Sequence, residues 1–367
     1  MPFKSKEQMY NYWLASSRAL TPLQHAKLLE LAGSSAALFE DPDMIRGAHL
    51  RMKDEAKSKL LERRNADLLE SELDALSRRA ISITTPCDDD YPALLREIAD
   101  PPRLLYYKGS LERLADTRLA VVGTRFPSYH GECNTRSICQ QLSAAGISII
   151  SGMARGIDTV AAKAALSGGT PTAAVLGCGI DTPYPKENSL LYEDICAKGA
   201  VISEYPPGVP PLAENFPPRN RIISGMSQAL FIAEGKLRSG GAISVRNAIE
   251  QNREVFALPG DISNPLSELP NSLIADGAII VLGAKTFFEN LNIGAAEKEI
   301  TEKSDIELDF SEKQIYTLLK RGELTAEQLS EKSGMDIATV NLTLTMLEIK
   351  QAVVRLPGNL YAIARRQ

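Results

Sequence analysis

Short apolar runs, separated by amphipathic segments, recur through residues 117–283 and constrain the fold more than any other feature of the chain. The runs are apolar throughout rather than alternating, which predicts strands buried on both faces. Most of the intervals between them admit a helix, so we predict a doubly wound parallel sheet over about 117–290. The runs are RLAVVG, ISIISG, PTAAVLG, AVISEYP, ALFIAEG, EVFALPG and AIIVLG.

The segment before these runs is expected to be helical. Apolar positions recur at helical spacing in 23–31 and in 60–76, with mixed charges on the other faces. We therefore predict an amino-terminal helical domain over 1–80. A Pro-punctuated stretch follows, in which Asp90 is expected to cap a short helix over 91–98 that ends at a pair of prolines.

The carboxyl-terminal part predicts a third domain. After a core domain over 81–290, residues 291–305 are polar and weakly patterned, as in a linker. Residues 306–367 show the order helix, helix–turn–helix, β-hairpin, which is typical of a winged helix. Its candidate recognition helix, 336–349, lacks Lys and Arg and offers only Asn341 for base readout, so we expect a protein-contact or accessory role for this domain. A weak contact of the wing with DNA through Arg355 is the alternative.

Composition excludes several classes of protein. The net charge is −5, from 41 basic and 46 acidic residues, so any nucleic-acid site must be a local patch. No apolar run approaches the ~20 residues of a membrane span, and the amino end has no long apolar segment, which together predict a cytoplasmic protein without membrane contact. We expect no metal, cofactor or disulfide framework, because the candidate ligands are scattered: His25, His49, His130, Cys87, Cys133, Cys139, Cys178 and Cys196.

Glycine-rich turns follow four of the predicted strands. The carboxyl ends of parallel strands share one edge of a sheet, and ligands bind there. Glycines let backbone amides point outward, helix amino ends carry partial positive charge, and arginines add forked donors, so such an edge suits phosphate. Asp158 is expected to hold one of these turns. The predicted site residues in the turns are Gly123, Thr124, Arg125, Gly152, Arg155, Gly156, Arg238, Ser239 and Gly240.

The stretch NFPPRNR at 215–221 adds further candidates. Phe216 is a candidate base-stacking residue, and Arg219, Asn220 and Arg221 are candidate phosphate ligands. The first predicted strand is followed by Phe-Pro-Ser in the region where GxGxxG would lie, which disfavours a dinucleotide dehydrogenase. The absence of GxxxxGK[ST] disfavours a P-loop NTPase.

Eight motifs, in this order, resemble the DprA family of DNA-processing proteins of natural transformation, also called Smf. The resemblance is essentially continuous over 86–283. It implies an extended Rossmann-like core that binds single-stranded DNA without sequence preference, forms a homodimer and loads the RecA recombinase. It also implies a SAM-like amino-terminal domain, a winged-helix carboxyl-terminal domain and no catalytic residues. The motifs are VVGTR, SGMARGID, GCGIDTPYPKEN, SEYPPG, NFPPRNRIISGMS, KLRSGGAIS, AIEQNREVFALPG and LIADGA.

The chain also departs from the family pattern. Thr124 replaces a serine, Ala162 stands where a histidine is usual, and the G-x-N-x-L-I segment is altered at 269–274. The amino-terminal segment ALTPLQHAK lacks the glycine-rich helix–hairpin–helix turn, which disfavours duplex binding there.

Two other functions stay open at this point. A nucleotide or N-glycosidic hydrolase would use the same glycine-rich edge, with Glu250 or Glu204 as the acid. The segment SGGAISVRNAIE at 239–250 partly matches P-G-G-x-G-T-x-x-E, the motif of nucleoside-monophosphate phosphoribohydrolases. A transcription regulator led by the winged helix is disfavoured by the lack of basic residues on its recognition helix.

Overall fold

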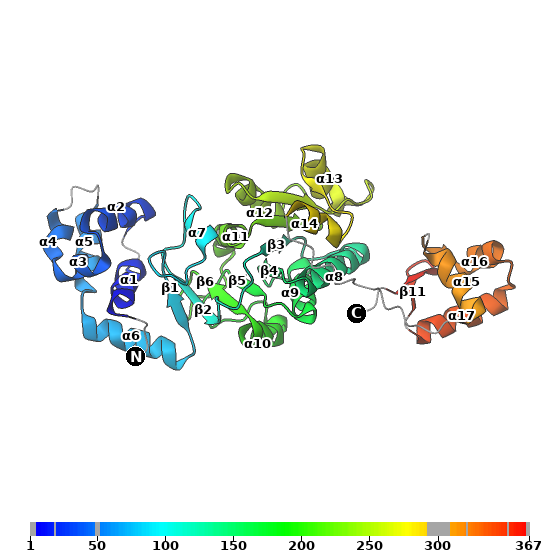
Figure 1. Ribbon diagram of the computed structural model, residues 1–367, viewed down its shortest axis with the longest axis horizontal. Helices are drawn as coiled ribbons and strands as arrows, with labels where there is room; N and C mark the ends of the chain where they lie inside the picture. Colours follow the sequence, from blue (N-terminus) through cyan, green and yellow to red (C-terminus); the bar gives the residue numbers. More distant parts are fainter. Residues whose placement is uncertain are drawn as a thin grey trace. The chain divides into compact units, whose positions relative to one another are not determined.

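The computed structural model describes residues 5–17, 20–47, 52–291, 309–320, 322–350 and 352–364. The chain divides into two compact units, 1–294 and 295–367 (Figure 1). The linker expected at 291–305 lies, apart from its first residue, outside the described residues, as does His49.

In the described residues before the sheet, six helices pack around Trp13. This side chain is fully buried and donates its indole N–H to the carbonyl of Leu60 at 3.0 Å. The apolar cluster that contains Trp13 continues into the sheet through Ile83 and Tyr106. The boundary expected at 80/81 therefore falls inside the first compact unit. These helices are α1 (Lys6–Ser16), α2 (Pro22–Ala32), α3 (Ser35–Glu40), α4 (Pro42–Gly47), α5 (Asp54–Glu62) and α6 (Ala66–Arg78).

Two local expectations in this region are wrong. The helical pattern over 60–76 is broken between α5 and α6, because Asn65 leaves the helix to cap α6 by accepting the amide of Leu68 at 3.1 Å. Asp90 does not cap a helix: its carboxylate accepts the Thr84 hydroxyl at 2.8 Å and the Tyr107 hydroxyl at 3.0 Å. The helix that follows, α7 (Ala93–Arg96), is shorter than expected and has no side-chain cap.

Nine strands form one sheet in the order β1-β2-β6-β5-β4-β3-β7-β8-β9. All neighbours from β6 to β9 are parallel, as the apolar runs predict, while β1 and β2 add an antiparallel edge. Neither of these two edge strands is among the apolar runs that predicted the sheet. The strands are β1 (Ser82–Thr84), β2 (Leu105–Gly109), β3 (Arg118–Val122), β4 (Ser148–Ser151), β5 (Ala173–Leu176), β6 (Ala200–Ser203), β7 (Ala229–Ile232), β8 (Glu254–Ala257) and β9 (Ile279–Ile280).

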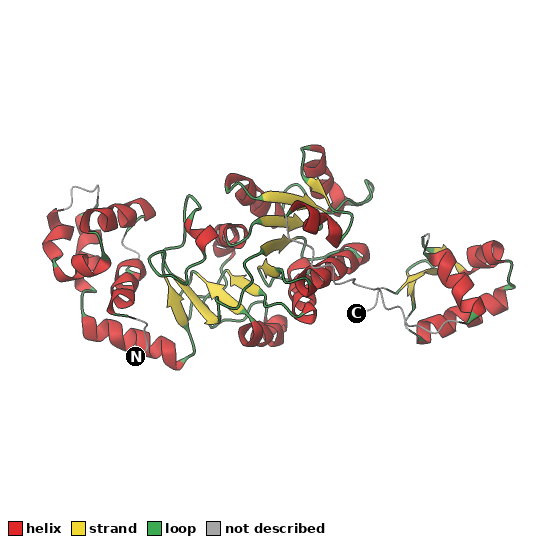
Figure 2. Cartoon of the chain, in the orientation of Figure 1, coloured by secondary structure: helices red, strands yellow, loops and turns green. Residues whose placement is uncertain are grey.

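Helices cover both faces of the sheet (Figure 2). In β3, Leu119 and Val121 pack with α8, α9 and α14, whereas Ala120 and Val122 pack with α7, α11, α12 and α13. The doubly wound prediction is therefore confirmed. Bounds are α8 (Tyr129–Ala144), α9 (Ile157–Gly168), α10 (Ser189–Lys198), α11 (Phe216–Gly225), α12 (Gly240–Glu250), α13 (Glu268–Ala275) and α14 (Ala284–Asn290), with single 3₁₀ turns at Lys186–Asn188, Ala213–Asn215 and Pro265–Ser267.

The winding of the chain reverses between β3 and β7. From β3 it proceeds through β4, β5 and β6 to one side, then returns to place β7 on the other side of β3. The loops after these two strands diverge, which opens a crevice at the carboxyl edge of the sheet.

The second unit has the winged-helix order expected from the sequence. Three helices pack on a small sheet of order β10-β12-β11, around a core that includes Ile315, Leu329 and Leu344. The hairpin turns at Gly358 and Asn359, which both have positive φ. The elements are α15 (Phe310–Leu319), β10 (Leu324–Thr325), α16 (Ala326–Ser333), α17 (Ile337–Ile349), β11 (Val353–Leu356) and β12 (Leu360–Ile363).

Candidate nucleic-acid interface

A cavity of about 570 Å³ lies at the carboxyl ends of β3 and β7, where the winding reverses. Its walls come from the loops after β3 and β7 and from the first turns of α11 and α12. Most of the site residues expected from the sequence line this cavity, and Arg155, Arg221 and Arg238 each adjoin a lining residue in the chain. The lining residues that carry the argument are Gly123, Thr124, Arg125, Asp158, Tyr184, Phe216, Arg219, Asn220, Ser239, Gly240 and Gly241.

The loops after β3 and β4 interlock beneath the cavity. The amide of Ile157, at the start of α9, donates to the carbonyl of Thr124 at 3.1 Å. Gly156 has φ +73°, and a Cβ there would lie 2.3 Å from that same carbonyl oxygen, so only glycine permits this approach. The side chain of Arg125 is exposed and makes no hydrogen bond or ion pair within the described part of the chain.

Two amides of the loop after β4, which was expected to offer its amides to a ligand, point inward instead. The carboxylate of Asp158 accepts the amides of Gly152 at 3.2 Å and Ala154 at 3.3 Å, so it does hold this loop as expected. Burial raises the pKa of Asp158, an effect opposed by the charge of Arg219 and by these two amides. Because the carboxylate already occupies these two donors, neither is available to a phosphate.

The amino end of α12 has free amides. Ser239 caps this helix by accepting the amide of Ala242, which leaves the amides of Gly240 and Gly241 without an intrahelical partner. Arg238 immediately precedes the cap, is exposed, and forms no ion pair or hydrogen bond with any residue that the structure describes. This helix end combines two amides without an intrahelical partner, partial positive charge and an exposed guanidinium, which together suit an anion.

An aromatic pair forms one wall of the cavity. The rings of Phe216 and Tyr184 lie with centroids 5.6 Å apart. A Cβ on Gly177 would lie 2.9 Å from the Phe216 ring, so this glycine makes room for the aromatic wall. Tyr184 was not selected from the sequence. It could have been identified as an aromatic residue within GIDTPYP, the loop that follows the predicted strand PTAAVLG.

Arg219 is buried under the cavity and is not a free phosphate ligand. Its guanidinium donates to the carbonyls of Gly152, at 2.9 Å, and Val175, and lies 5.6 Å from the centre of the Phe216 ring. Asn220 accepts from Arg219 at 3.2 Å and donates to the carbonyl of Gly240 at 3.3 Å. The two residues thus join the loop after β4 to the start of α12 and add a buried positive charge below the site.

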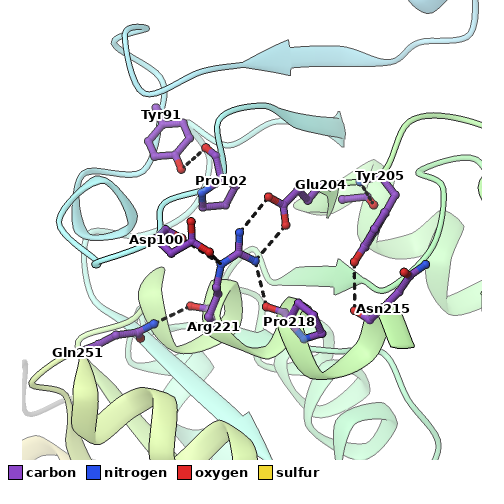
Figure 3. Close-up of polar contacts among 10 residues, drawn as sticks. Tyr91, Asp100, Pro102, Glu204, Tyr205, Asn215, Pro218, Arg221 and Gln251 are labelled. Atoms are coloured by element: carbon purple, nitrogen blue, oxygen red, sulfur yellow. Dashed lines mark hydrogen bonds and ion pairs between the residues drawn. The ribbon is translucent and has the colours of Figure 1, made fainter. Parts of the chain in front are cut away.

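Arg221 points away from the cavity, so the geometry does not support its expected role as a phosphate ligand. Its guanidinium forms two hydrogen bonds of 2.9 Å with Glu204 and an ion pair of 3.3 Å with Asp100 (Figure 3). It also donates to the carbonyls of Asp100 and Pro218. These contacts use most of the donors of Arg221 and tie α11 to the loop after β6 and to the segment before β2.

Arg155 has an exposed carboxylate partner. Its guanidinium binds Glu187 through two hydrogen bonds, one of 2.7 Å, and this contact raises the pKa of Arg155 and lowers that of Glu187. The pair lies beside the cavity, because Ala154 contributes to its lining and Glu187 stands three residues after Tyr184.

The acids required by the hydrolase alternative lie elsewhere. Glu204 is paired with Arg221, and Glu250 is exposed at the far end of α12. Neither contributes to the lining of the cavity.

Metal-binding clusters and membrane-spanning helices are not found in the described ranges. Among those residues, no three His, Cys, Asp or Glu side chains gather as a metal site would require. No helix in the described part of the chain has the length and apolarity to cross a membrane.

Comparison with known proteins identifies the family. A family model described as DNA recombination-mediator protein A matches residues 82–292, and one described as the DprA winged helix domain matches residues 300–359. The chain belongs to the DNA recombination-mediator protein A family. The resemblance seen in the sequence is thereby confirmed.

Relatives of this chain include proteins of Escherichia coli and Streptococcus pneumoniae. It is 41% identical to Protein Smf of Escherichia coli K12 over 292 residues, which cover 76% of this chain and 77% of that protein. It is 46% identical to DNA processing protein DprA of Streptococcus pneumoniae over 194 residues, which cover 53% and 68% of the two chains.

Two solved structures of this family share the fold. The X-ray structure of DprA from S. pneumoniae matches with a TM-score of 0.66 and 36% identity, covering 77% of this chain and 97% of that one. DprA from Helicobacter pylori matches with a TM-score of 0.53 and 28% identity, covering 58% and 95%. The H. pylori structure is described as giving insight into the single-stranded DNA binding mode of that protein.

Proposed function

We propose that this protein binds single-stranded DNA without sequence preference at the carboxyl edge of its sheet and acts as a non-catalytic recombination mediator. The observation that carries the proposal is the open anion site between β3 and β7. There Arg125 and the first turn of α12, where the amides of Gly240 and Gly241 have no intrahelical partner, line an aromatic-walled cavity, and Arg238 adjoins this lining. Neither guanidinium has a hydrogen-bond or ion-pair partner among the described residues. Family membership and the binding mode described for the H. pylori relative support the same ligand.

The proposed contacts divide between phosphates and bases. One phosphate lies at the amino end of α12, where helix amides and Arg238 neutralise it, and a neighbouring phosphate binds Arg125. A base stacks on Phe216 or Tyr184, an interaction that contributes about 1–3 kcal/mol and accepts any base. Arg219 and Asn220 support these contacts from below, and Arg155 can join them once it leaves Glu187.

We further propose that the strand is protected and then passed to the RecA recombinase in the cytoplasm during natural transformation or recombination. A homodimer formed through the Rossmann-like domain would present two such sites and gain affinity by effective concentration. These steps are supported by the family to which the chain belongs. For the winged-helix domain we propose a protein contact, because α17 exposes Leu342, Met346 and Ile349 and carries no basic residue.

The test is fluorescence anisotropy with labelled oligo-dT and a matching duplex over a range of salt concentrations. Wild-type protein is expected to prefer the single strand and to lose affinity steeply with salt, whereas Arg125→Ala and Arg238→Ala each weaken binding. Lys198→Ala is the matched control, because this exposed cation ends α10 at the opposite edge of the sheet.

Two outcomes would contradict the proposal. Undiminished binding by the Arg125→Ala/Arg238→Ala double variant would place the DNA site elsewhere in the chain. A wild-type protein that binds no single strand, and instead releases free base from a nucleoside monophosphate, would favour the hydrolase.

A further inference from the structure

A buried carboxylate lies directly beneath the loop that carries Arg125. Glu234 follows β7 and is 5% exposed. One of its carboxylate oxygens accepts the amide of Ser128 at 2.8 Å, and the other accepts the Ser128 hydroxyl at 2.5 Å. Its own carbonyl accepts the amide of Thr124 at 2.8 Å. A single residue therefore binds the loop on both sides of Arg125.

The first turn of α8 packs against this carboxylate. Ser128 caps α8 by accepting the amide of Gly131 at 3.0 Å. A Cβ on Gly131 would lie 2.3 Å from the carboxyl carbon of Glu234, so only glycine at this position leaves space for the carboxylate. The partial positive charge at the amino end of α8 offsets the buried negative charge. The amino end of α8 is thus occupied by Glu234, whereas that of α12 is open.

The strand end that carries Glu234 is itself held in place. The next residue, Gly235, donates its amide to the carbonyl of Leu266 at 2.7 Å and accepts the amide of Leu269 at 3.1 Å. The backbone next to Glu234 is therefore held in place, which fixes the position of its carboxylate under the loop. A loop without such a hold would leave an exposed, unpaired guanidinium free to sample many positions.

We propose that Glu234 is a positioning residue that holds Arg125 at the DNA site through Ser128 and Thr124. This inference rests on the proposed function. A buried anion near a phosphate site would by charge alone repel the ligand, because like charges repel. The benefit of the carboxylate is therefore geometric: it decreases the freedom that Arg125 must lose when a phosphate binds.

Glu234→Gln separates the geometric effect of the carboxylate from the effect of its charge, because the two effects change DNA affinity in opposite directions. Glutamine has nearly the same shape but lacks the charge, and one of its two terminal atoms is an NH2 donor that cannot accept from Ser128. If Glu234 only contributes charge, the variant binds oligo-dT more tightly. If it positions Arg125, we expect the variant to bind about tenfold more weakly, with the slope of log affinity against log salt smaller by about 0.7, the loss of one phosphate contact.

A thermodynamic cycle tests whether the effect passes through Arg125. We expect Glu234→Gln to change affinity by less than about twofold in an Arg125→Ala background, and by the full tenfold in an Arg238→Ala background, because only contacting or coupled residues are non-additive. Ser128→Ala removes one of the two donors and is expected to give the same pattern with a smaller amplitude. Glu193→Gln, an exposed acid on α10, controls for the change in net charge.

Thermal unfolding is recorded for every variant, and Ser128→Ala replaces Glu234→Gln in the cycle if the latter unfolds at the assay temperature. The inference is overturned if Glu234→Gln binds as well as wild type or more tightly. It is equally overturned if Glu234→Gln weakens binding to the same extent with and without Arg125. Failure of the proposed function is distinct from both, because Arg125→Ala and Arg238→Ala would then leave binding unchanged.

Discussion

Arg155 and Glu187 form a two-bonded ion pair across the surface beside the cavity, and both side chains are about half exposed. An exposed pair of this kind adds little to stability. Its consequence for binding is larger, because the carboxylate occupies the two donors of Arg155 that a phosphate would use. The pair therefore competes with DNA for the same guanidinium.

Removing this competitor is expected to strengthen DNA binding. Glu187→Gln frees Arg155, so affinity for oligo-dT should rise several-fold and the salt slope should steepen by about 0.7, one more phosphate contact. The matched control is Glu132→Gln, which removes an equal charge from the surface pair with Arg136. An equal rise in both variants would show that net charge alone is responsible.

Phe216 is expected to stack on a base. Phe216→Ala should weaken binding to oligo-dT by about tenfold to a hundredfold, the equivalent of ~1–3 kcal/mol. An oligonucleotide with abasic sites is the control ligand, since it keeps every phosphate. The preference for oligo-dT over the abasic strand should disappear in the variant. Equal losses on both ligands would mean that Phe216 acts on the shape of the site instead.

Arg221 is expected to stabilise the fold rather than to bind DNA. Arg221→Ala leaves Glu204 partly buried without its partner, which should lower the free energy of unfolding by about 3 kcal/mol. Arg155→Ala, from an exposed pair, should change it little. Urea unfolding measures both. The salt slope of DNA binding, measured at a temperature where the variants are folded, should stay unchanged in Arg221→Ala but fall in Arg125→Ala.

His25 is expected to make stability depend on pH. This side chain is 7% exposed on α2, and burial, reinforced by the charge of Arg103, lowers its pKa from 6.5 to about 4. Between pH 6.5 and 4, His25 binds a proton in the unfolded chain but stays neutral in the folded chain. The free energy of unfolding therefore falls as the pH drops through this range. The loss at pH 5 is about 2 kcal/mol. His25→Gln should remove this part of the difference between urea unfolding at about pH 7 and pH 5; an unchanged difference would contradict the assignment.

Much of the architecture is predictable from local patterns. The parallel strands follow from uniformly apolar runs, since only strands buried on both faces lack polar alternation. The turns after β3 and β7 could be assigned to one edge because parallel strands end on the same side. Local patterns failed where a tertiary contact competed with them. Asp90 had the position of a helix cap, yet the hydroxyls of Thr84 and Tyr107 attract its carboxylate instead.

The sequence by itself determined that the turns after the parallel strands share one edge of the sheet, because the positions of strands and turns depend on short-range pattern. Only the tertiary structure decided which of the candidate residues are free. Arg219 and Arg221 look alike in the chain, but residues two apart point to nearly opposite sides of a helix. One therefore lies buried under the cavity and the other is paired with Glu204. The same holds for the helix amino ends: Glu234 fills that of α8, while that of α12 stays open, because occupancy depends on carboxylates distant in sequence.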